Sequence, residues 1–492
     1  MATLAGHSGR TTLSKRVETQ QSLADPGSFA PEDLDLQSVD PLGFEGYSDA
    51  LRHARERSGV DESVQAGRAT IGGIEVQLAE FEFSFLGGSM GEVAGERLTR
   101  ALEVAARRHV PFVLRTATGG ARMQEGMRSL VQMPKVVVAR RELAEQHQPF
   151  VAVLGHPTTG GVLASIGALA DVTIAEADAT IGFAGPRVVE RLSGAPVPSG
   201  SHTANSAYAH GLVDELVPKT DAHAFVASLL KLLAPDDPEE VEVPPPLEHS
   251  ALEDAWEAVE AARSPARPLA TELIGEVCDL FVELRGDRGG TDDPSVRVGL
   301  GRIAGRRAML VALDRNLAPG PSAYRKAKRC VRIASDLLLP VVTLVDTRGA
   351  DPTPDSEARG IAWEIASLFE AMLGIDSPVL SVVTGEGGSG GALAFAVADE
   401  LVVFHDAIFS VIAPEAAAEI LWRSPTRAPD AARALRLTAS GLYELGIADW
   451  VVDATLGSDS VRFVIADALD RLTHDGTQDF SARRRARWRA GP

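Results

Sequence analysis

The stretch of sequence that decides the fold runs Gly155-His156-Pro157-Thr158-Thr159-Gly160-Gly161-Val162-Leu163-Ala164-Ser165-Ile166-Gly167-Ala168-Leu169-Ala170-Asp171. It follows an apolar run, Pro149 to Leu154, that predicts a strand, and Gly160-Gly161 then open a helix of small residues that ends near Asp171. The first N–H groups of a helix have no intrahelical acceptor and carry partial positive charge. We therefore expect a strand–turn–helix unit whose turn can hold an anion or a developing oxyanion.

The same pattern occurs a second time, from Pro378 through Gly385, Ser389 and Gly390-Gly391 to Asp399. Matching landmarks keep a nearly constant offset in residue number: Pro111 and Pro340, Pro149 and Pro378, Gly160 and Gly390, Asp171 and Asp399, Pro186 and Pro414. A nearly constant separation over such a length indicates an internal duplication. We therefore expect two domains of the same fold.

Each half has a second small-residue turn upstream of the first. Gly119-Gly120 precedes Gly160-Gly161 by the same stretch of chain as Gly349-Ala350 precedes Gly390-Gly391. In this register Thr159 stands opposite Ser389. We predict that the turns supply backbone N–H donors to two oxyanions, one in each half, from Gly119, Gly120, Gly160, Gly161, Gly349, Ala350, Gly390 and Gly391.

Composition limits the class of protein. A chain of 492 residues is long enough for two domains of roughly 200 residues each. Its 48 basic and 68 acidic residues give a net charge of −20, which argues against nucleic acid or an anionic membrane as a partner. Two cysteines make neither a disulfide framework nor a four-cysteine zinc site. Without an apolar signal core, we expect a cytoplasmic protein.

The order of predicted elements is that of an α/β protein, in which strands and helices alternate and right-handed crossovers join parallel strands. We expect the chain to divide into a disordered tail (1–40), a first domain (41–234), an acidic, proline-rich linker with a short helix at Leu252 to Ala262 (235–269), a second domain (270–473) and a solvated basic tail (474–492).

Two other motifs compete for the same turns. Gly385-Glu386-Gly387-Gly388-Ser389-Gly390 spells a dinucleotide-binding fingerprint, with Asp406 about 20 residues further on. The first half keeps only the outer glycines, so the fingerprint is not what was duplicated. Gly87 to Gly91 and Gly387 to Gly391 both spell a nucleophile elbow, but no histidine and acid partners are evident. Both readings are therefore less favoured than oxyanion binding.

The longer motifs resemble a known enzyme family. The first half resembles the beta subunit of the bacterial acetyl-CoA carboxylase carboxyltransferase through Gly87-Gly88-Ser89-Met90-Gly91, Gly119-Gly120-Ala121-Arg122-Met123-Gln124-Glu125-Gly126, Pro157-Thr158-Thr159-Gly160-Gly161 and Ile181-Gly182-Phe183-Ala184-Gly185-Pro186-Arg187. The second half resembles the alpha subunit through Phe281-Val282-Glu283-Leu284-Arg285-Gly286-Asp287-Arg288, Tyr324-Arg325-Lys326-Ala327, Gly385 to Ala394 and Ser410-Val411-Ile412-Ala413-Pro414-Glu415.

This resemblance implies an α/β fold of two tandem crotonase-like (ClpP/crotonase) domains and a carboxyl transfer from carboxybiotin to acetyl-CoA or a short acyl-CoA, giving malonyl-CoA for fatty acid biosynthesis. The first-half turns would hold the thioester enolate and the second-half turns the biotin oxygen. Biotin would arrive on a separate biotin carboxyl carrier protein, charged by a biotin carboxylase, and this chain would need no metal. The family forms its site between two chains, which implies a homodimer or higher homo-oligomer.

The resemblance also implies residues that bind the acyl-CoA. Arg122, Arg187, Arg325 and Lys326 are the expected partners of the CoA phosphates, with Lys135, Lys328 and Arg329 as further cations; Phe183, Ala184 and Gly185 would line the pantetheine path. Ordinary surface pairing or packing is the alternative for each. For His156, a hydrogen-bonded turn residue is favoured over a proton-transfer role.

Some features depart from the family pattern. The beta subunit's zinc ribbon is absent, and Arg348 replaces the proline of the alpha subunit's Asp-Thr-Pro-Gly-Ala turn. Two other functions therefore stay open: a malonyl-thioester decarboxylase that uses the same oxyanion holes, and a non-catalytic paralogue within a carboxylase complex.

Overall fold

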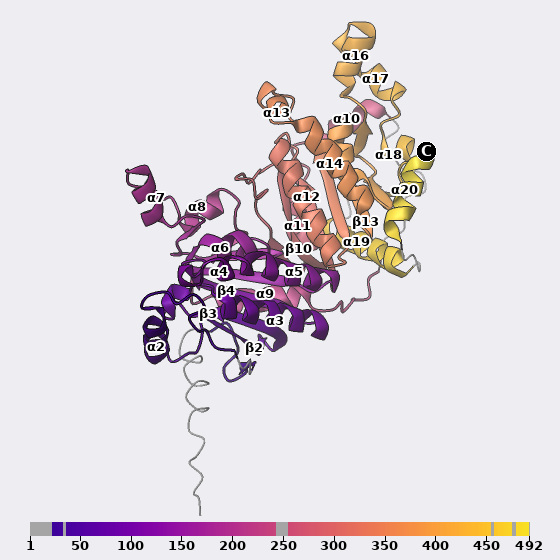
Figure 1. Cartoon of the computed structure of the whole chain (residues 1–492). Coiled ribbons are helices and arrows are strands. Elements are labelled where there is room, and N and C mark those ends of the chain that lie inside the picture. Colours follow the sequence, from indigo (N-terminus) through magenta and orange to yellow (C-terminus); the bar gives the residue numbers. More distant parts are fainter. Residues whose placement is uncertain (1–21, 33–35, 243–253, 454–456, 475–478, 492) are drawn as a thin grey trace, which may run out of the picture. The chain divides into compact units, whose positions relative to one another are not determined.

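The computed structural model describes residues 22–32, 36–242, 254–453, 457–474 and 479–491. The chain divides into two compact units, unit 1 from Met1 to Leu233 and unit 2 from Ala234 to Pro492. Unit 1 runs from indigo to magenta in Figure 1, and unit 2 continues to yellow. Among the described residues, each unit is a mixed α/β structure built on one eight-stranded sheet. The α/β expectation is confirmed.

The sheet of unit 1 has the strand order β1-β2-β3-β4-β5-β6-β8, with β7 paired to β5. The strands β1, β2 and β3 pair antiparallel, and all later pairs are parallel. The strands are β1 (Ala30–Pro31), β2 (Val64–Ile71), β3 (Ile74–Phe81), β4 (Phe112–Thr118), β5 (Phe150–Thr159), β6 (Val172–Glu176), β7 (Ile181–Gly182) and β8 (Glu215–Val217).

Helices cover this sheet and carry the first core. The helix α3 packs on α5 and on β2 and β3, and its buried face consists of Leu98, Leu102 and small residues. The helices are α2 (Tyr47–Ser58), α3 (Glu92–Arg108), α4 (Met127–Leu130), α5 (Gln132–Glu145), α6 (Gly160–Val162), α7 (Pro186–Ser193), α8 (Ala204–Ala209) and α9 (Ala222–Leu233), with short 3₁₀ turns at Leu86–Gly88 and Met123–Glu125.

Unit 2 repeats the arrangement with the order β16-β14-β13-β12-β11-β10-β9 and β15 paired to β13. Again the first three strands, β9, β10 and β11, pair antiparallel, and all later pairs are parallel. The strands are β9 (Leu280–Glu283), β10 (Val296–Ile303), β11 (Arg306–Leu313), β12 (Val341–Thr347), β13 (Val379–Gly388), β14 (Glu400–Phe404), β15 (Ile408–Ser410) and β16 (Trp450–Val452).

The helices of unit 2 follow the same plan. The helix α12 packs on α14 and on β10 and β11. Figure 1 shows α12 beside α14. The helices are α10 (Ala255–Ala262), α11 (Ala270–Val277), α12 (Pro321–Asp336), α13 (Pro354–Ala358), α14 (Ile361–Gly374), α15 (Ser389–Ala396), α16 (Pro414–Trp422), α17 (Ala428–Ala434), α18 (Ala439–Glu444), α19 (Gly457–His474) and α20 (Phe480–Ala490), with a 3₁₀ turn at Pro425–Arg427.

The register of the duplication differs from the glycine-based one. In the parallel pairs, Thr118 lies opposite Thr158 in unit 1, and Thr347 lies opposite Gly387 in unit 2. Thr347 therefore corresponds to Thr118 and Gly387 to Thr158, and the same offset makes Ser389, not Gly390, the counterpart of Gly160. The correspondence of Thr159 to Ser389 was wrong because matching glycine letters shifts the turn by one position.

A π-helical turn accounts for the change of register further along. In unit 1, α6 is followed by a π-helix at Leu163–Gly167, whereas α15 of unit 2 is a regular helix. A π-turn accommodates one additional residue within a helix. The strand partners beyond it, Val172 and Glu400, are accordingly one position closer in the chain than the offset of the preceding strands requires. The helix expected to end near Asp171 therefore ends at Gly167.

Part of the expected N-terminal tail belongs to the fold. Residues 1–21 and 33–35 lie outside the described residues, but β1 pairs with β2, and Asp25 accepts hydrogen bonds from the N–H groups of Gly72 and Gly73 at 2.9 and 2.8 Å. His223 Nε2 lies 2.8 Å from the same carboxylate. The polar composition hid this because the contacts are made by side chains with a distant hairpin.

The expected linker and basic tail also differ from the structure. Residues 243–253 of the linker lie outside the described part, but Asp237 and Glu239 donate backbone hydrogen bonds to Gly305 and Ala304 of unit 2. The basic run forms α20, in which Arg484 is fully buried and pairs with Asp399 at 2.6 Å. A charged run is usually solvated, but in this run the Arg484 side chain is buried and paired with a buried carboxylate.

Candidate functional site

The two small-residue turns of unit 1 meet in space. A Cβ atom placed on Gly120 would lie 3.1 Å from Gly160 Cα and 3.4 Å from Gly161 N. The backbones touch because Gly120 and Gly160 have φ values of +106° and +67°, which favour glycine. The structure thus brings the four first-half site residues together.

The turns of unit 2 meet in the same way. A Cβ atom on Gly349 would lie 3.1 Å from Gly388 O, and one on Gly391 would lie 2.6 Å from Ala350 N. Gly349 has a φ of +125°, and Ser389, at the start of α15, has a φ of +63°. The duplication therefore reproduces the backbone conformation even where serine replaces glycine.

The hydrogen bonds separate the engaged N–H groups from the available ones. Gly119 donates to Gly87 O and Gly160 to Phe183 O, at 2.9 and 2.8 Å. Gly120 and Gly349 donate to the hydroxyls of Thr118 and Thr347, at 3.0 and 3.3 Å. These four predicted donors are therefore already engaged within the fold.

The available donors form one matched set in each unit. Within the described residues, the N–H groups of Ala121 and Gly161 in unit 1, and of Ala350, Gly390 and Gly391 in unit 2, donate no hydrogen bond. Ala121 was missed by the sequence analysis. Its signal is the match of Thr118-Gly119-Gly120-Ala121 with Thr347-Arg348-Gly349-Ala350, which places Ala121 opposite Ala350.

Arg122 does not face a ligand. Its side chain is fully buried, forms ion pairs with Glu62 and Glu125, and donates to Ser89 O at 2.7 Å. Burial lowers the pKa of this guanidinium. The charge of Glu62 and the hydrogen bond to it raise the pKa by more than burial lowers it, so the pKa is raised above its ordinary value and the group stays charged. The prediction that Arg122 binds CoA phosphate was wrong, because two carboxylates from within the unit already satisfy it.

Lys326 is likewise internal. Its side chain is 2% exposed, and Nζ pairs with Asp292 at 2.7 Å and donates to Val296 O at 2.9 Å. The prediction that Lys326 binds CoA was therefore also wrong. Arg325 is about one-third exposed and pairs with Asp287 and Glu364.

The further cations also have contacts within the fold. Lys135 pairs with Glu96, Lys328 with Glu364, and Arg329 donates to Arg285 O at 3.3 Å.

The loop before α7 adjoins the unit 1 turns. The carbonyl of Phe183 accepts the hydrogen bond from Gly160 N–H, and the Phe183 side chain is 70% exposed. Ala184 and Gly185 are half-buried, and Arg187 is exposed in the first turn of α7. The loop therefore presents an aromatic ring beside the turns, and the start of α7 presents a cation directly after the loop.

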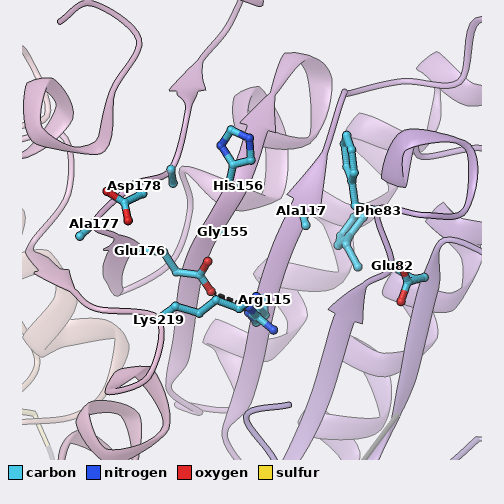
Figure 2. Close-up of a pocket in the computed structure, with 12 residues that line it drawn as sticks. Glu82, Phe83, Arg115, Ala117, Gly155, His156, Glu176, Ala177, Asp178 and Lys219 are labelled. Carbon is cyan, nitrogen blue, oxygen red and sulfur yellow. Dashed lines mark hydrogen bonds and ion pairs between the residues drawn. The ribbon is translucent and has the colours of Figure 1, made fainter. Parts of the chain in front are cut away.

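A cavity of about 910 Å³ opens at the carboxyl ends of the unit 1 strands. Figure 2 shows the ion pair between Arg115 of β4 and Glu176 of β6. His156 and Lys219 also line this cavity. Its other lining residues are Phe81, Glu82, Phe83, Ala117, Gly155, Ala177, Asp178 and Ala179. The carboxyl ends of parallel strands are where α/β proteins bind ligands. The sequence did not predict Arg115 or Lys219 as ligand-binding residues.

His156 is exposed, and its Nδ1 accepts a hydrogen bond from Thr180 N–H at 3.2 Å. The favoured expectation of a hydrogen-bonded turn residue agrees with this contact. Nε2 is then the ring nitrogen that carries the proton in the neutral side chain.

Residues of the two competing motifs have structural contacts. Asp406, the acid of the dinucleotide fingerprint, forms an ion pair with Arg267. Ser89, in the first elbow motif, accepts a hydrogen bond from Arg122 Nε at 3.2 Å. Among the described residues, no helix is long and apolar enough to cross a membrane, and no group of three or more His, Cys, Asp or Glu is arranged to hold a metal ion.

Solved structures share this fold. A transcarboxylase 12S with methylmalonyl-coenzyme A and methylmalonic acid bound superposes with a TM-score of 0.77 at 23% identity, covering 97% of this chain and 100% of that chain. A single-chain, multi-domain long-chain acyl-CoA carboxylase gives a TM-score of 0.71 at 20% identity, covering 92% of this chain and 45% of that one. The expectation of two crotonase-like domains is confirmed.

Sequence comparisons identify the family. The model for acetyl co-enzyme A carboxylase carboxyltransferase-like proteins matches residues 249–489. The acetyl-coenzyme A carboxylase carboxyl transferase subunits beta/alpha of Salinispora tropica are 42% identical over 95% of this chain and 88% of the relative. A probable biotin-dependent acyl-coenzyme A carboxylase beta3 subunit of Mycobacterium bovis is 34% identical over 89% of each chain. The chain belongs to the carboxyl transferase family of the biotin-dependent acyl-CoA carboxylases, with its beta-like and alpha-like halves in one polypeptide.

Proposed function

We propose that this carboxyltransferase moves a carboxyl group from carboxybiotin to acetyl-CoA or another short acyl-CoA, giving malonyl-CoA or its homologue. The observation that carries the proposal is the pair of matched N–H sets, Ala121 with Gly161 and Ala350 with Gly390. A carboxyl transfer between these reactants develops negative charge on two oxygens, one on each reactant. Two preorganised pairs of donors meet that requirement.

The reaction balances without a side-chain base. The bond between the ureido nitrogen and the carboxyl carbon breaks, carbon dioxide leaves, and the electron pair stays on the ureido group. This anion takes the α-proton of the thioester, and the enolate carbon then bonds to carbon dioxide. Unit 1 would hold the enolate oxygen and unit 2 the ureido oxygen, where biotin supplies the base.

The cavity of unit 1 and the Phe183 loop support the acyl-CoA side. The cavity shares the carboxyl ends of β4 and β5 with the turns, and Arg115 and Lys219 face it. A long anionic ligand such as CoA needs local cations on a chain with a net charge of −20. Of the first-half candidates from the sequence, Phe183, Ala184 and Gly185 remain for the pantetheine path and Arg187 for the phosphates.

Biotin would come on a separate biotin carboxyl carrier protein, loaded by a biotin carboxylase, in the cytoplasm. We further propose a homodimer as the smallest assembly, with each site formed from unit 1 of one chain and unit 2 of another. Exposed apolar side chains in and beside α4 support a covering partner, with Met123 at 83%, Met127 at 66% and Leu130 at 46% exposure.

The test is the reverse half-reaction, in which purified chain receives malonyl-CoA with or without biocytin and acetyl-CoA release is followed. Release that depends on biocytin supports carboxyl transfer. Release without biocytin would favour the malonyl-thioester decarboxylase. No release, also with methylmalonyl-CoA and an added carrier, would favour a non-catalytic paralogue.

Variants of the turns connect the activity to the proposed donors. Gly120→Ala and Gly349→Ala each place a side chain at positive φ against the partner turn, and we expect kcat to fall roughly 100- to 1,000-fold. Gly73→Ala and Gly446→Ala are matched controls, because both glycines have positive φ but no atom within 4 Å of the added Cβ. Control variants as impaired as the turn variants would contradict the assignment.

A further inference from the structure

Arg348 occupies a distinctive place in the duplication. The register of the strand pairs puts it opposite Gly119, directly before the turn that carries the available N–H of Ala350. Its carbonyl oxygen would lie 2.0 Å from a Cβ atom placed on Gly388, so the two turns of unit 2 are in contact at this residue. Unit 1 has no side chain at the equivalent position. At this position of the duplication, unit 2 therefore carries a cation and unit 1 does not.

The guanidinium of Arg348 is weakly held. Its side chain is 69% exposed, and the carboxylate beside it, that of Glu386, is 3.8 Å away. Glu386 is 4% exposed and already accepts two hydrogen bonds of 2.8 Å from Arg263. Arg263 also pairs with Glu415 at 2.7 Å. Because Arg263 satisfies Glu386, Arg348 is available to another anion.

Other acidic groups near the turn are also engaged. Asp346 is buried, accepts from Glu386 N–H at 3.0 Å and pairs with Arg315 at 2.9 Å. Asp351 accepts from the N–H and hydroxyl of Thr353, at 3.1 and 2.9 Å. A ligand anion at the turn would therefore compete with the 3.8 Å contact to Glu386 and with the electrostatic attraction of Arg348 to Glu415, which itself pairs with Arg263.

We propose that Arg348 binds the anionic reactant at the unit 2 donors, first through the carboxylate of carboxybiotin and then through the ureido oxygen that becomes negative when carbon dioxide leaves. This inference rests on the proposed function, since it assigns the biotin side to unit 2. In this step the nitrogen–carbon bond breaks, its electron pair stays on the ureido group and no proton moves. A guanidinium beside that group stabilises the developing charge.

Kinetics of the reverse half-reaction test the role, with biotin methyl ester as an uncharged acceptor. We expect Arg348→Gln and Arg348→Pro to lower kcat/KM for the acceptor about tenfold, Arg348→Lys to restore part of it, and the KM for malonyl-CoA to stay unchanged. Added salt should lower kcat/KM of the unmodified chain and affect the glutamine variant much less. Arg436→Gln, at an exposed arginine elsewhere in unit 2, is the charge-matched control.

Binding of an anionic probe separates this inference from the proposed function. The probe is 1-carboxymethyl-2-imidazolidinone, a ureido ring with a carboxylate, and its methyl ester is the neutral control; titration calorimetry measures both. Tighter binding of the acid to the unmodified chain than to Arg348→Gln supports the inference even if the half-reaction fails. An active chain whose glutamine variant matches it in kinetics and binding overturns the inference and leaves the function standing.

Discussion

Arg122 is the centre of a buried charge cluster that fixes the first turn of unit 1. Removal of its side chain would leave Glu62 and Glu125 buried without a counter-charge. We expect Arg122→Ala to lower the free energy of unfolding of unit 1 by about 3–5 kcal/mol. All five tryptophans lie in unit 2, so tryptophan fluorescence does not report on the unfolding of unit 1. Urea denaturation followed by far-UV circular dichroism measures the loss instead.

Arg128→Ala provides the comparison for Arg122. Its side chain is 55% exposed and pairs with Glu92 at 2.9 Å, so its loss should change the free energy of unfolding by less than about 1 kcal/mol. Equal losses for the two variants would show that the Arg122 cluster is not the buried network described above.

Asp25 gives unit 1 a dependence on pH. Burial raises its pKa, but hydrogen bonds from Thr70, Gly73, His223 and Gly72 lower that pKa well below its usual range. A carboxylate with a lowered pKa in the folded state stabilises the fold above its unfolded pKa of about 4, and this contribution is lost as the pH falls through the folded value. We expect Asp25→Asn to be less stable than the unmodified chain at pH 7.

The difference between Asp25→Asn and the unmodified chain should shrink as the pH falls from about 5 towards 2. Urea unfolding at several pH values measures it, with Asp49→Asn at a carboxylate that is 72% exposed as the control. A difference that grows on acidification would contradict the assignment.

The predicted cations show where reasoning from sequence stops. Arg122 and Lys326 stand in motifs of the right family, but their charges are satisfied by Glu62 and Asp292, which lie far from them in the chain. Nothing in the local pattern distinguishes a lysine that faces solvent from one that is buried. The turn glycines could be predicted because positive φ restricts the residue type.

At the scale of elements, strand positions were the easiest to predict. The strand β5 (Phe150–Thr159) begins within the apolar run Pro149 to Leu154 that predicted it and extends beyond the end of that run. Buried parallel strands are easy to find because they read as continuous apolar runs. The π-turn after α6 could not be predicted, since an inserted residue within a helix leaves no mark in a row of small residues. The match of glycine letters at the first turn was a separate error of one position, and it concealed Ala121.

The helix α20 is joined to the rest of unit 2 through Arg484. Arg484 donates to Asp399 Oδ2 at 2.6 Å and to the carbonyls of Met372, Ile375 and Ser377. We expect Arg484→Ala to lower the free energy of unfolding of unit 2 by about 3–5 kcal/mol, because it leaves a buried carboxylate unpaired. Urea denaturation followed by tryptophan fluorescence measures it, with the exposed Arg485→Ala as control; a small loss would show that α20 is dispensable.

At the scale of the whole molecule, the proposed shared site predicts complementation. Gly120→Ala impairs unit 1 and Gly349→Ala impairs unit 2, so a mixed dimer would have one intact site. Co-expression of the two inactive variants should restore about a quarter of the unmodified activity if chains pair at random. Activity that stays at the level of the separate variants would show that each site lies within one chain.

Each domain has a buried aspartate that pairs with an arginine, but the arginine comes from a different part of the chain in each domain. Asp171 pairs with Arg140, which lies 31 residues earlier, whereas Asp399 pairs with Arg484, which lies 85 residues later. During synthesis on the ribosome, Asp171 therefore emerges after its arginine. Arg484, in contrast, is synthesised roughly 4 to 17 seconds after Asp399 at ordinary elongation rates. The amino-terminal domain can therefore pair its buried aspartate while it is being synthesised. The carboxy-terminal domain passes through a period in which Asp399 has no counter-charge and the incompletely folded domain is accessible to chaperones and proteases.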